Sequence, residues 1–521
     1  MRAPSIPPVS GLLVLGLVAS CTEPSPSASD AALGDTSIAS DAPVLDASTP
    51  APTWGPCPAR FRDECATIAM PLDHDDPSRG TIDVLVSRRG TGTRQLWLLQ
   101  GGPGGSAETF FGWHDFLANL DPELEVYTIE HRGVGESTRL GCASGEAASS
   151  EEGVQIARSE WAACQADVEA EWGERLRYFD TTQAAHDLAL AIELTRRDGV
   201  PVFVYGGSYG TYWANRFGVL HPSAASGLIL DAPVAPGSDL HRYDLAFETI
   251  GRRVFSELCL EAPRCHEHLG DDPAAFLQRV ADALEAGHCG SLGVDFDTWR
   301  VVFSIFLMDY NLRNWLPALV YRLDRCSPDD QAAIARLFGQ LFGAGGGTGV
   351  PRMSRVLQTH ICLSEFWPAG LADETEIERA RADNLFFQDG IGHVYAAQAS
   401  WPRYEPGPVA GEYAPPSVPM LVMAGELDPA APPADVGYGY RDHLRGPAQH
   451  FVEIPYGAHT VLTGAGSVGP DRPSCPVQLV RAFLTDPEGA LPSCASDVLF
   501  PSFDAPAAAL DRYWGTSDLY D

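Results

Sequence analysis

The feature that most constrains the fold is a series of short apolar segments, each followed directly by a loop rich in glycine or acidic residues. These segments are Leu96–Leu99, Glu125–Ile129, Val202–Tyr205, Gly227–Leu230 and Met420–Met423. Between several of them lie patterns with helical spacing, such as Gln183–Arg196. Short apolar strands that alternate with helices predict a mostly parallel sheet covered by helices on both faces, and therefore an α/β fold.

A mostly helical stretch interrupts this series. Between Pro236 and Pro415 the strand pattern disappears, and apolar residues recur at helical spacing instead. The helical segments expected there are Tyr243–Leu258, Asp272–Ala286, Trp299–Leu312 and Asp329–Phe342. Two further strands, Glu64–Met70 and Ile82–Ser87, are expected to open the domain. We predict a core in two parts, residues 54–235 and 416–521, with a helical cap inserted at 236–415.

The first 20 residues are expected to carry targeting information, and a disordered tether is expected to follow them. Arg2 and the apolar stretch Gly11–Val18, which is too short to span a bilayer, indicate a signal peptide over residues 1–20. The stretch ends at Cys21 in a sequence that resembles a bacterial lipobox, so Cys21 is expected to carry lipid and anchor an exported protein to the cell envelope. An ordinary signal peptide, with secretion, is the alternative. Residues 21–53 are rich in Ser, Pro, Ala and Asp and predict a disordered tether.

The cysteines agree with export, because disulfides form in oxidising compartments. Of the twelve cysteines, eight are close in sequence and predict four local disulfides. The expected pairs are Cys57–Cys65, Cys142–Cys164, Cys259–Cys265 and Cys475–Cys494. The pairing of Cys289, Cys326 and Cys362 stays open. Metal-ligand residue types occur together at Cys265–His268, but a disulfide cysteine among polar residues is the preferred interpretation, so no metal site is expected.

The charge balance excludes several classes of function. The 521-residue chain has a formal net charge of −34, which argues against a nucleic-acid partner, since such binding depends on Lys and Arg contacts to phosphates. All 35 basic residues are arginine. Without lysine the chain can form neither a Schiff base nor a phosphate-binding loop that ends in lysine.

A candidate nucleophile stands in the pattern G-x-S-x-G at Gly206–Gly210. The apolar segment Val202–Tyr205 precedes it, and the helix-compatible segment Thr211–Leu220 follows. A tight turn from strand to helix at this place would hold Ser208 in a strained conformation with its Oγ exposed at the carboxyl edge of the sheet.

A serine hydroxyl needs a base to take its proton, and the base needs an orienting carboxylate. Asp428 lies just beyond the strand Met420–Met423, and His459 lies just beyond the strand-like Phe451–Ile454. The chain order Ser, acid, His is the order that accompanies a G-x-S-x-G turn. Each residue alone has a structural explanation, as a turn former or a loop histidine, but the three in order at strand ends predict a catalytic triad.

Acyl transfer also needs hydrogen-bond donors for the developing oxyanion. The backbone amide after the nucleophile, that of Tyr209, is one candidate. The other is Gly102, in the glycine-rich loop Gln100–Ser106 after the first core strand, where the lack of side chains lets a backbone amide approach a reacting carbonyl.

These motifs resemble those of a known family. Gln100–Ser106 resembles the HGGPG loop of proline iminopeptidases, with Gln100 where histidine is usual. Glu130–Ser137 resembles their D-x-R-G-x-G-x-S segment, with Glu130 in place of aspartate. The cysteine-bracketed segment Cys475–Cys494 is similar to that of the secreted tripeptidyl-aminopeptidase-like hydrolases. The resemblance covers roughly residues 54–495, densely in the core and thinly in the cap.

The resemblance implies an α/β-hydrolase fold and an aminopeptidase that acts on peptides without a cofactor. It assigns the nucleophile, its two partners and the oxyanion donors to Ser208, Asp428, His459, Gly102 and Tyr209. Gln100 leaves the backbone amides of its loop in place but weakens any expectation of strict proline specificity. The cap of such an enzyme is expected to bind the substrate ammonium, and Glu365, which has aromatic neighbours, is the candidate.

Two other functions remain open from the sequence alone. A carboxylesterase would use the same triad on ester substrates, and the fold does not separate the two activities. A non-catalytic, lipid-anchored binding protein on the same scaffold is the alternative from another class. The oligomeric state is left open.

Overall fold

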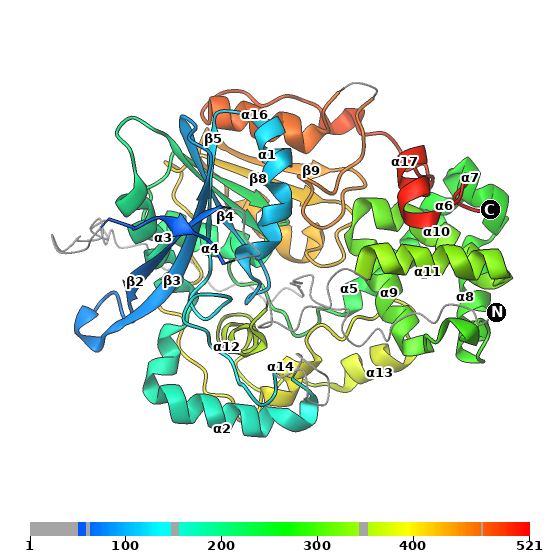
Figure 1. Ribbon diagram of the computed structural model, residues 1–521, viewed down its shortest axis with the longest axis horizontal. Coiled ribbons are helices and arrows are strands. Elements are labelled where there is room, and N and C mark those ends of the chain that lie inside the picture. The colour runs from blue at the N-terminus through cyan, green and yellow to red at the C-terminus, as the bar shows by residue number, and fades with distance from the viewer. Residues whose placement is uncertain (1–50, 59–62, 147–155, 343–352, 470–471) are drawn as a thin grey trace, which may run out of the picture.

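The computed structural model describes residues 51–58, 63–146, 156–342, 353–469 and 472–521. They form one nine-stranded sheet in the order β1-β2-β3-β5-β4-β6-β7-β8-β9. The strands are β1 Gly55–Pro56, β2 Glu64–Pro71, β3 Thr81–Arg89, β4 Arg94–Leu99, β5 Leu124–Ile129, β6 Val202–Gly207, β7 Gly227–Asp231, β8 Met420–Gly425 and β9 Gln449–Ile454. The pairs from β5 to β9 are parallel, and β1, β2 and β3 form an antiparallel extension (Figure 1). Every strand that the sequence predicted is present.

Both faces of the parallel sheet are covered, which explains its nearly continuous apolar strands. On β4 the buried Trp97 and Leu99 pack in the cluster that includes helices α3 and α4. The alternate residues Leu96 and Leu98 pack in a second cluster with helices α1 and α16. The helices are α1 His114–Leu120, α3 Thr181–Thr195, α4 Tyr209–Leu220, α15 Tyr438–His443 and α16 Cys475–Thr485. This is the predicted α/β-hydrolase architecture, with helices on both faces.

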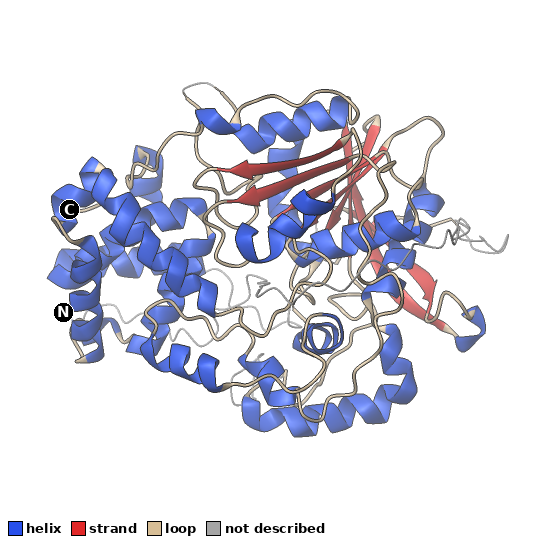
Figure 2. Cartoon of the chain, turned by 180° about the vertical axis from the view of Figure 1, so that it is seen from behind, coloured by secondary structure: helices blue, strands red, loops and turns tan. Residues whose placement is uncertain are grey.

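The described chain between β7 and β8 is mostly helical, and Figure 2 shows arrowheads of parallel strands pointing toward these helices. Their bounds are α5 Leu245–Arg253, α6 Cys259–Glu261, α7 Pro263–Leu269, α8 Pro273–Glu285, α9 Phe296–Met308, α10 Tyr310–Arg325, α11 Pro328–Phe342, α12 Arg355–Glu365, α13 Thr375–Asp383 and α14 Gly392–Ala397. We call them the cap. They lie at the carboxyl edge of the parallel strands, where the predicted site residues also lie.

One helix expectation for the cap was wrong. The single helix expected over Trp299–Leu312 is two helices, because Asp309 is extended between α9 and α10. The Asp309 carboxylate accepts hydrogen bonds from the backbone amides of Asn311 and Leu312 and thereby caps α10. An N-cap inside an apolar helical pattern ends one helix and begins another.

Two segments outside residues 236–415 also pack against the cap. Helix α2, Trp161–Trp172, lies beside α14, where Trp161 contacts the ring of His393. The C-terminal turns α17, Ala507–Ala509, and η10, Leu510–Trp514, lie against α11 (Figure 1). The layer above the sheet edge is therefore assembled from three parts of the chain.

The described cysteines confirm the four predicted disulfides and add one. Cys57–Cys65, Cys142–Cys164, Cys259–Cys265 and Cys475–Cys494 are paired. The pairing that the sequence left open is Cys289–Cys326, and Cys362 is a buried free thiol. Within the described ranges no group of three or more Cys, His, Asp and Glu side chains could hold a metal ion.

The targeting segment lies outside the described residues. The predicted signal peptide 1–20, the lipidation site Cys21 and the tether up to residue 50 belong to it. In the part of the chain that the structure describes, no helix has the length and apolarity needed to cross a bilayer.

Candidate functional site

The predicted nucleophile lies in a strained turn between β6 and α4. Ser208 has φ 60° and ψ −128°, a conformation that L-residues rarely adopt. The turn closes because its neighbours have no side chains: a Cβ on Gly206 would lie 2.1 Å from the Gly210 carbonyl oxygen, and one on Gly210 would lie 2.3 Å from the Leu99 carbonyl oxygen. Only glycine fits at both positions, as the sequence pattern predicted.

The structure brings the predicted acid and base together. Asp428 follows β8, His459 follows β9, and His459 Nδ1 lies 2.8 and 3.0 Å from the two Asp428 carboxylate oxygens. Asp428 Oδ1 also accepts the backbone amides of Ala430 and Ala431, each at 2.8 Å, which fixes the carboxylate. Burial by itself lowers the pKa of His459, but the Asp428 carboxylate outweighs burial and holds the pKa above its ordinary value.

The hydroxyl and the far imidazole nitrogen are both unpaired. Ser208 Oγ and His459 Nε2 are buried and have no hydrogen-bond partner among the described residues. The two segments nevertheless meet, since a Cβ on Gly207 would lie 3.5 Å from the side chain of Thr460. Hydrogen bonds of this kind are often long without substrate and tighten when it binds. The arrangement leaves one buried proton donor and one buried acceptor free for chemistry.

Asp231 connects the turn of Ser208 with the loop of His459, although no sequence pattern predicted a role for it. It accepts the backbone amides of Val461 and Leu462 at 2.7 and 2.9 Å and the hydroxyl of Tyr205 at 2.9 Å. Its backbone carbonyl accepts the amide of Ser208. Burial raises the pKa of Asp231 to about 6, against the lowering effect of these hydrogen bonds. Its position directly after the predicted strand Gly227–Leu230, at the same sheet edge, was the signal that could have identified it.

The glycine-rich loop lies directly against the candidate nucleophile. A Cβ on Gly101 would lie 2.8 Å from Ser208 Cβ and 3.3 Å from its Oγ, so only glycine allows this approach. The next residue, Gly102, has φ 122°, a conformation suited to glycine. Tyr209 begins α4, and first-turn amides of a helix have no partner within the helix. Both predicted oxyanion donors therefore belong to segments that border Ser208.

Two motif residues that depart from the family pattern support this loop. Gln100 Oε1 accepts the amide of Gly101 at 2.8 Å. Glu130, which is buried, accepts the Ser106 hydroxyl at 2.6 Å and the Ala107 amide at 3.1 Å. A Cβ on Gly135 would collide with the Glu130 carboxylate at 2.2 Å, which explains the glycine in that motif. The substituted side chains thus still hold the loop.

The arginine of the same motif, Arg132, holds several segments of the core together. Arg132 is buried and forms two 2.7 Å bonds to the carboxylate of Asp187 on α3. It also donates to the backbone carbonyls of Pro71, Leu72 and Tyr178. Burial alone would raise the pKa of Asp187, but Arg132 and His74 lower it to about 2. These contacts connect the start of the sheet with α3.

Glu365 does not face open space, contrary to the expectation that it would receive a substrate ammonium. Its carboxylate is fully buried and lies 3.1 Å from the Arg216 guanidinium. Tyr404 donates to one oxygen at 2.5 Å and Tyr212 to the other at 2.8 Å. The Thr181 amide adds a fourth contact, at 3.3 Å. With both oxygens occupied, the carboxylate joins α12 to α4 and has no free position for a ligand.

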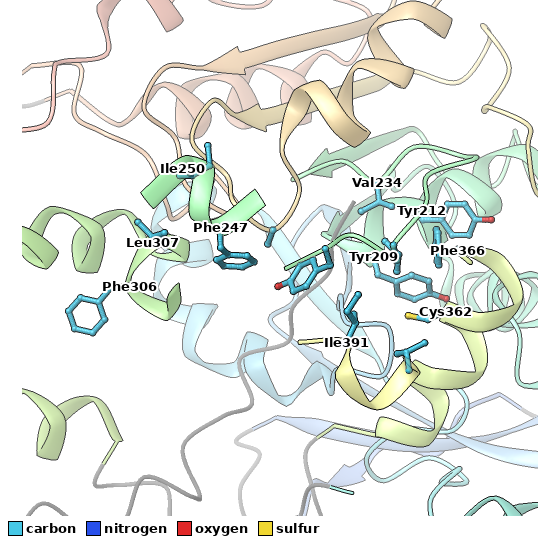
Figure 3. Packing of buried hydrophobic residues seen from close by; sticks show 14 of the residues in the cluster. Tyr209, Tyr212, Val234, Phe247, Ile250, Phe306, Leu307, Cys362, Phe366 and Ile391 are labelled. Carbon is cyan, nitrogen blue, oxygen red and sulfur yellow. The ribbon is translucent and has the colours of Figure 1, made fainter. Parts of the chain in front are cut away.

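The surroundings of Glu365 explain this arrangement. Figure 3 shows Tyr209 and Tyr212 of α4 beside Phe366, the residue after Glu365. The Phe366 ring lies 4.6 Å from that of Tyr212 and 6.3 Å from that of Tyr209. Although burial favours the neutral acid, Arg216 and the donated hydrogen bonds hold the pKa of Glu365 below its ordinary value. The aromatic neighbours that suggested a ligand pocket form a packed contact between cap and core.

The chain is similar to several known proteins. Residues 96–285 match the family described as alpha/beta hydrolase fold. The chain is 24% identical over 433 residues to the tripeptidyl aminopeptidases of Streptomyces lividans and Streptomyces coelicolor, which covers 76% of this chain and 78% and 77% of theirs. The crystal structure of proline iminopeptidase from Mycobacterium smegmatis aligns over 81% of this chain and 99% of that chain, with 15% identity and a TM-score of 0.33. Over most of its length the chain is thus similar to tripeptidyl aminopeptidases.

Proposed function

We propose, since this chain is an α/β-hydrolase of the tripeptidyl-aminopeptidase-like family, that it is a serine aminopeptidase that releases short peptides from a free N-terminus. The observation that carries the proposal is the 2.8 Å contact of Asp428 with His459 at the sheet edge where Ser208 occupies its strained turn. This constellation can transfer an acyl group without a cofactor.

In the proposed mechanism His459 Nε2 takes the Ser208 proton as Oγ attacks the peptide carbonyl. The carbonyl becomes a tetrahedral oxyanion, to which the amides of Tyr209 and Gly102 donate. Asp428 stabilises the imidazolium through Nδ1, and the imidazolium then protonates the leaving amine as the C–N bond breaks. Water, deprotonated by the same histidine, attacks the resulting acyl-enzyme and frees Ser208.

The sequence similarity to tripeptidyl aminopeptidases is what favours a peptide substrate. Because both Glu365 oxygens are occupied, we do not assign the substrate ammonium to this residue. The ammonium acceptor remains a prediction for another part of the cap. Export is also part of the proposal: five disulfides suit an oxidising compartment. Replacing Cys21 with Ser should release a lipid-anchored protein into the soluble fraction, and unchanged fractionation would rule out the anchor.

The proposal is tested with matched peptides that differ only at the N-terminus. A tripeptide p-nitroanilide with a free amine should be hydrolysed at least about 100-fold faster, by kcat/KM, than its N-acetylated form, because acetylation removes a charge that the site must pair. A carboxylesterase would be nearly indifferent to acetylation and would prefer a p-nitrophenyl ester. Equal cleavage of both peptides would contradict the aminopeptidase assignment while leaving the serine hydrolase mechanism intact.

A further inference from the structure

The cap contacts the backbone of both turns that carry the Asp428–His459 pair. Met308, the last residue of α9, accepts the backbone amide of His459 at 3.1 Å through its carbonyl oxygen. Arg313, on α10, donates Nη1 to the carbonyl of Leu427 at 3.1 Å and Nη2 to the carbonyl of Tyr456. Leu427 immediately precedes Asp428, and Tyr456 lies in the turn that leads from β9 to His459. One guanidinium thus connects the turn of the acid with the turn of the base.

The setting of Arg313 is unusual for a cation. Its residue surface is 2% exposed, and within the described ranges it forms no ion pair with a carboxylate. The Tyr310 ring lies 5.5 Å from the guanidinium carbon and provides a cation–π contact. Burial lowers the pKa of Arg313 to about 10, and Asp428 is among the acidic groups that oppose this shift. A buried cation without a carboxylate is costly, so an apolar residue would be favoured here if packing alone mattered.

We propose that Arg313 is a positioning residue that sets the geometry of the Asp428–His459 pair, and this inference rests on the proposed function. The guanidinium is a planar fork whose donors have fixed relative directions, so two carbonyls bound to it are fixed relative to each other. Since the pair must hold its geometry to orient the imidazole, a shift of about 1 Å can lower the rate by about 100-fold. On this account the cap is a structural part of the catalytic centre.

Arg322 provides a matched control for a purely structural role. It is also fully buried and also lies on α10, and it donates to the backbone carbonyls of Asp518, Leu519 and Asp521. Its acceptors belong to the C-terminal segment rather than to the turns of Asp428 and His459. It differs from Arg313 in having a carboxylate partner, Asp330, at 3.1 Å. If a buried arginine on α10 only stabilises the cap, replacing either one should have the same consequences.

The experiment compares Arg313→Met, Arg313→Lys and Arg322→Met in the full chain, well below each variant's Tm. The substrates are a free-amine tripeptide p-nitroanilide and p-nitrophenyl acetate. We expect Arg313→Met to lower kcat about 10- to 100-fold on both, with KM within about 3-fold of wild type. Arg313→Lys, which keeps the charge but not the fork, should be intermediate. Arg322→Met should lower Tm and leave kcat within about 2-fold.

Each contrary outcome has a distinct meaning. Wild-type kcat in Arg313→Met, or equal losses of kcat in Arg313→Met and Arg322→Met, would overturn the positioning role. If Arg313→Met does not fold, Arg313→Lys decides: wild-type kcat overturns the inference, and a lowered kcat at unchanged KM supports it. A fluorophosphonate probe on wild type separates this inference from its premise. If Ser208 is labelled but the Arg313 variants keep the wild-type kcat, only the inference is wrong. If Ser208 is not labelled, the proposed function and the inference are both wrong.

Discussion

Two buried carboxylates pair with nitrogen groups where the cap meets the core, and the two sites differ in what they leave unpaired. At the junction of α12 and α4, Glu365 is saturated by Arg216, Tyr212 and Tyr404. At the sheet edge, Asp428 holds one nitrogen of His459, and the other nitrogen has no hydrogen-bond partner among the residues that the structure describes. Most buried polar groups in proteins are hydrogen-bonded, and a catalytic role is one reason for an exception. We infer that the first site stabilises the structure, and we propose that the second moves a proton.

The largest effect is expected when the proposed nucleophile of the second site is removed. Ser208→Ala should lower kcat by about 10⁶-fold, because the members of a triad act as a unit. Folding should be nearly unaffected, since Ser208 Oγ has no hydrogen-bond partner within the described ranges. Measuring kcat and Tm of the purified variant checks both expectations. A rate within 100-fold of wild type would mean that another residue carries the reaction.

Removing the charge of the carboxylate should have the next largest effect. Asp428→Asn is expected to lower kcat by about 10⁴-fold, because an asparagine can present its amide to Nδ1 and stabilise the wrong tautomer of His459. Steady-state kinetics on the free-amine peptide measure the loss. A similar loss in Asp231→Asn with an active Asp428→Asn would transfer the orienting role to Asp231, which contacts the backbone of the same loop.

Removing the carboxylate charge at the first site should change the stability of the fold rather than the rate of the reaction. Glu365→Gln leaves Arg216 buried without its carboxylate and should lower the free energy of unfolding by about 3–5 kcal/mol. The control Glu374→Gln breaks a half-exposed pair with Arg158 and should cost less than about 1 kcal/mol. Denaturant unfolding measures both. A stable Glu365→Gln protein with raised KM for free-amine peptides alone would instead restore the role that the sequence suggested for Glu365.

The smallest expected effect is a shift in pH dependence. His459 must be neutral to act as a base, and its pKa lies above the ordinary value because of Asp428. The kcat/KM of wild type should therefore fall as the pH decreases through that raised pKa. In Asp428→Asn only the Asp231 carboxylate still opposes burial, which lowers the pKa of His459, so the acid limb of the residual activity should move to lower pH. If the acid limb does not move, the group that titrates there is not His459.

The two regions also differ in how well the sequence predicts them. Ser208, Asp428 and His459 each follow a short apolar strand, so local pattern and chain order were enough to place them on one edge. The contacts of Glu365 could not be predicted in this way. Arg216 is 149 residues away in the sequence, and no local pattern shows which face of α12 meets α4.

The buried charges of the cap could not be predicted from the sequence. Arg313 lies within an apolar helical pattern, where an arginine would ordinarily reach solvent. Its role depends on the carbonyls of Leu427 and Tyr456, more than 110 residues away, and a backbone acceptor has no sequence signature. The break at Asp309 was missed for the opposite reason, because a local capping residue interrupted a pattern that was apolar on both sides.

Labelling with a fluorophosphonate, followed by mass mapping of the modified peptide, tests the central claim most directly. The reagent phosphonylates a serine only where a base activates it and donors stabilise the anion. We predict one modified residue in wild type, Ser208, and none in Ser208→Ala. Modification of a different serine in wild type, with hydrolysis retained by Ser208→Ala, would contradict the account.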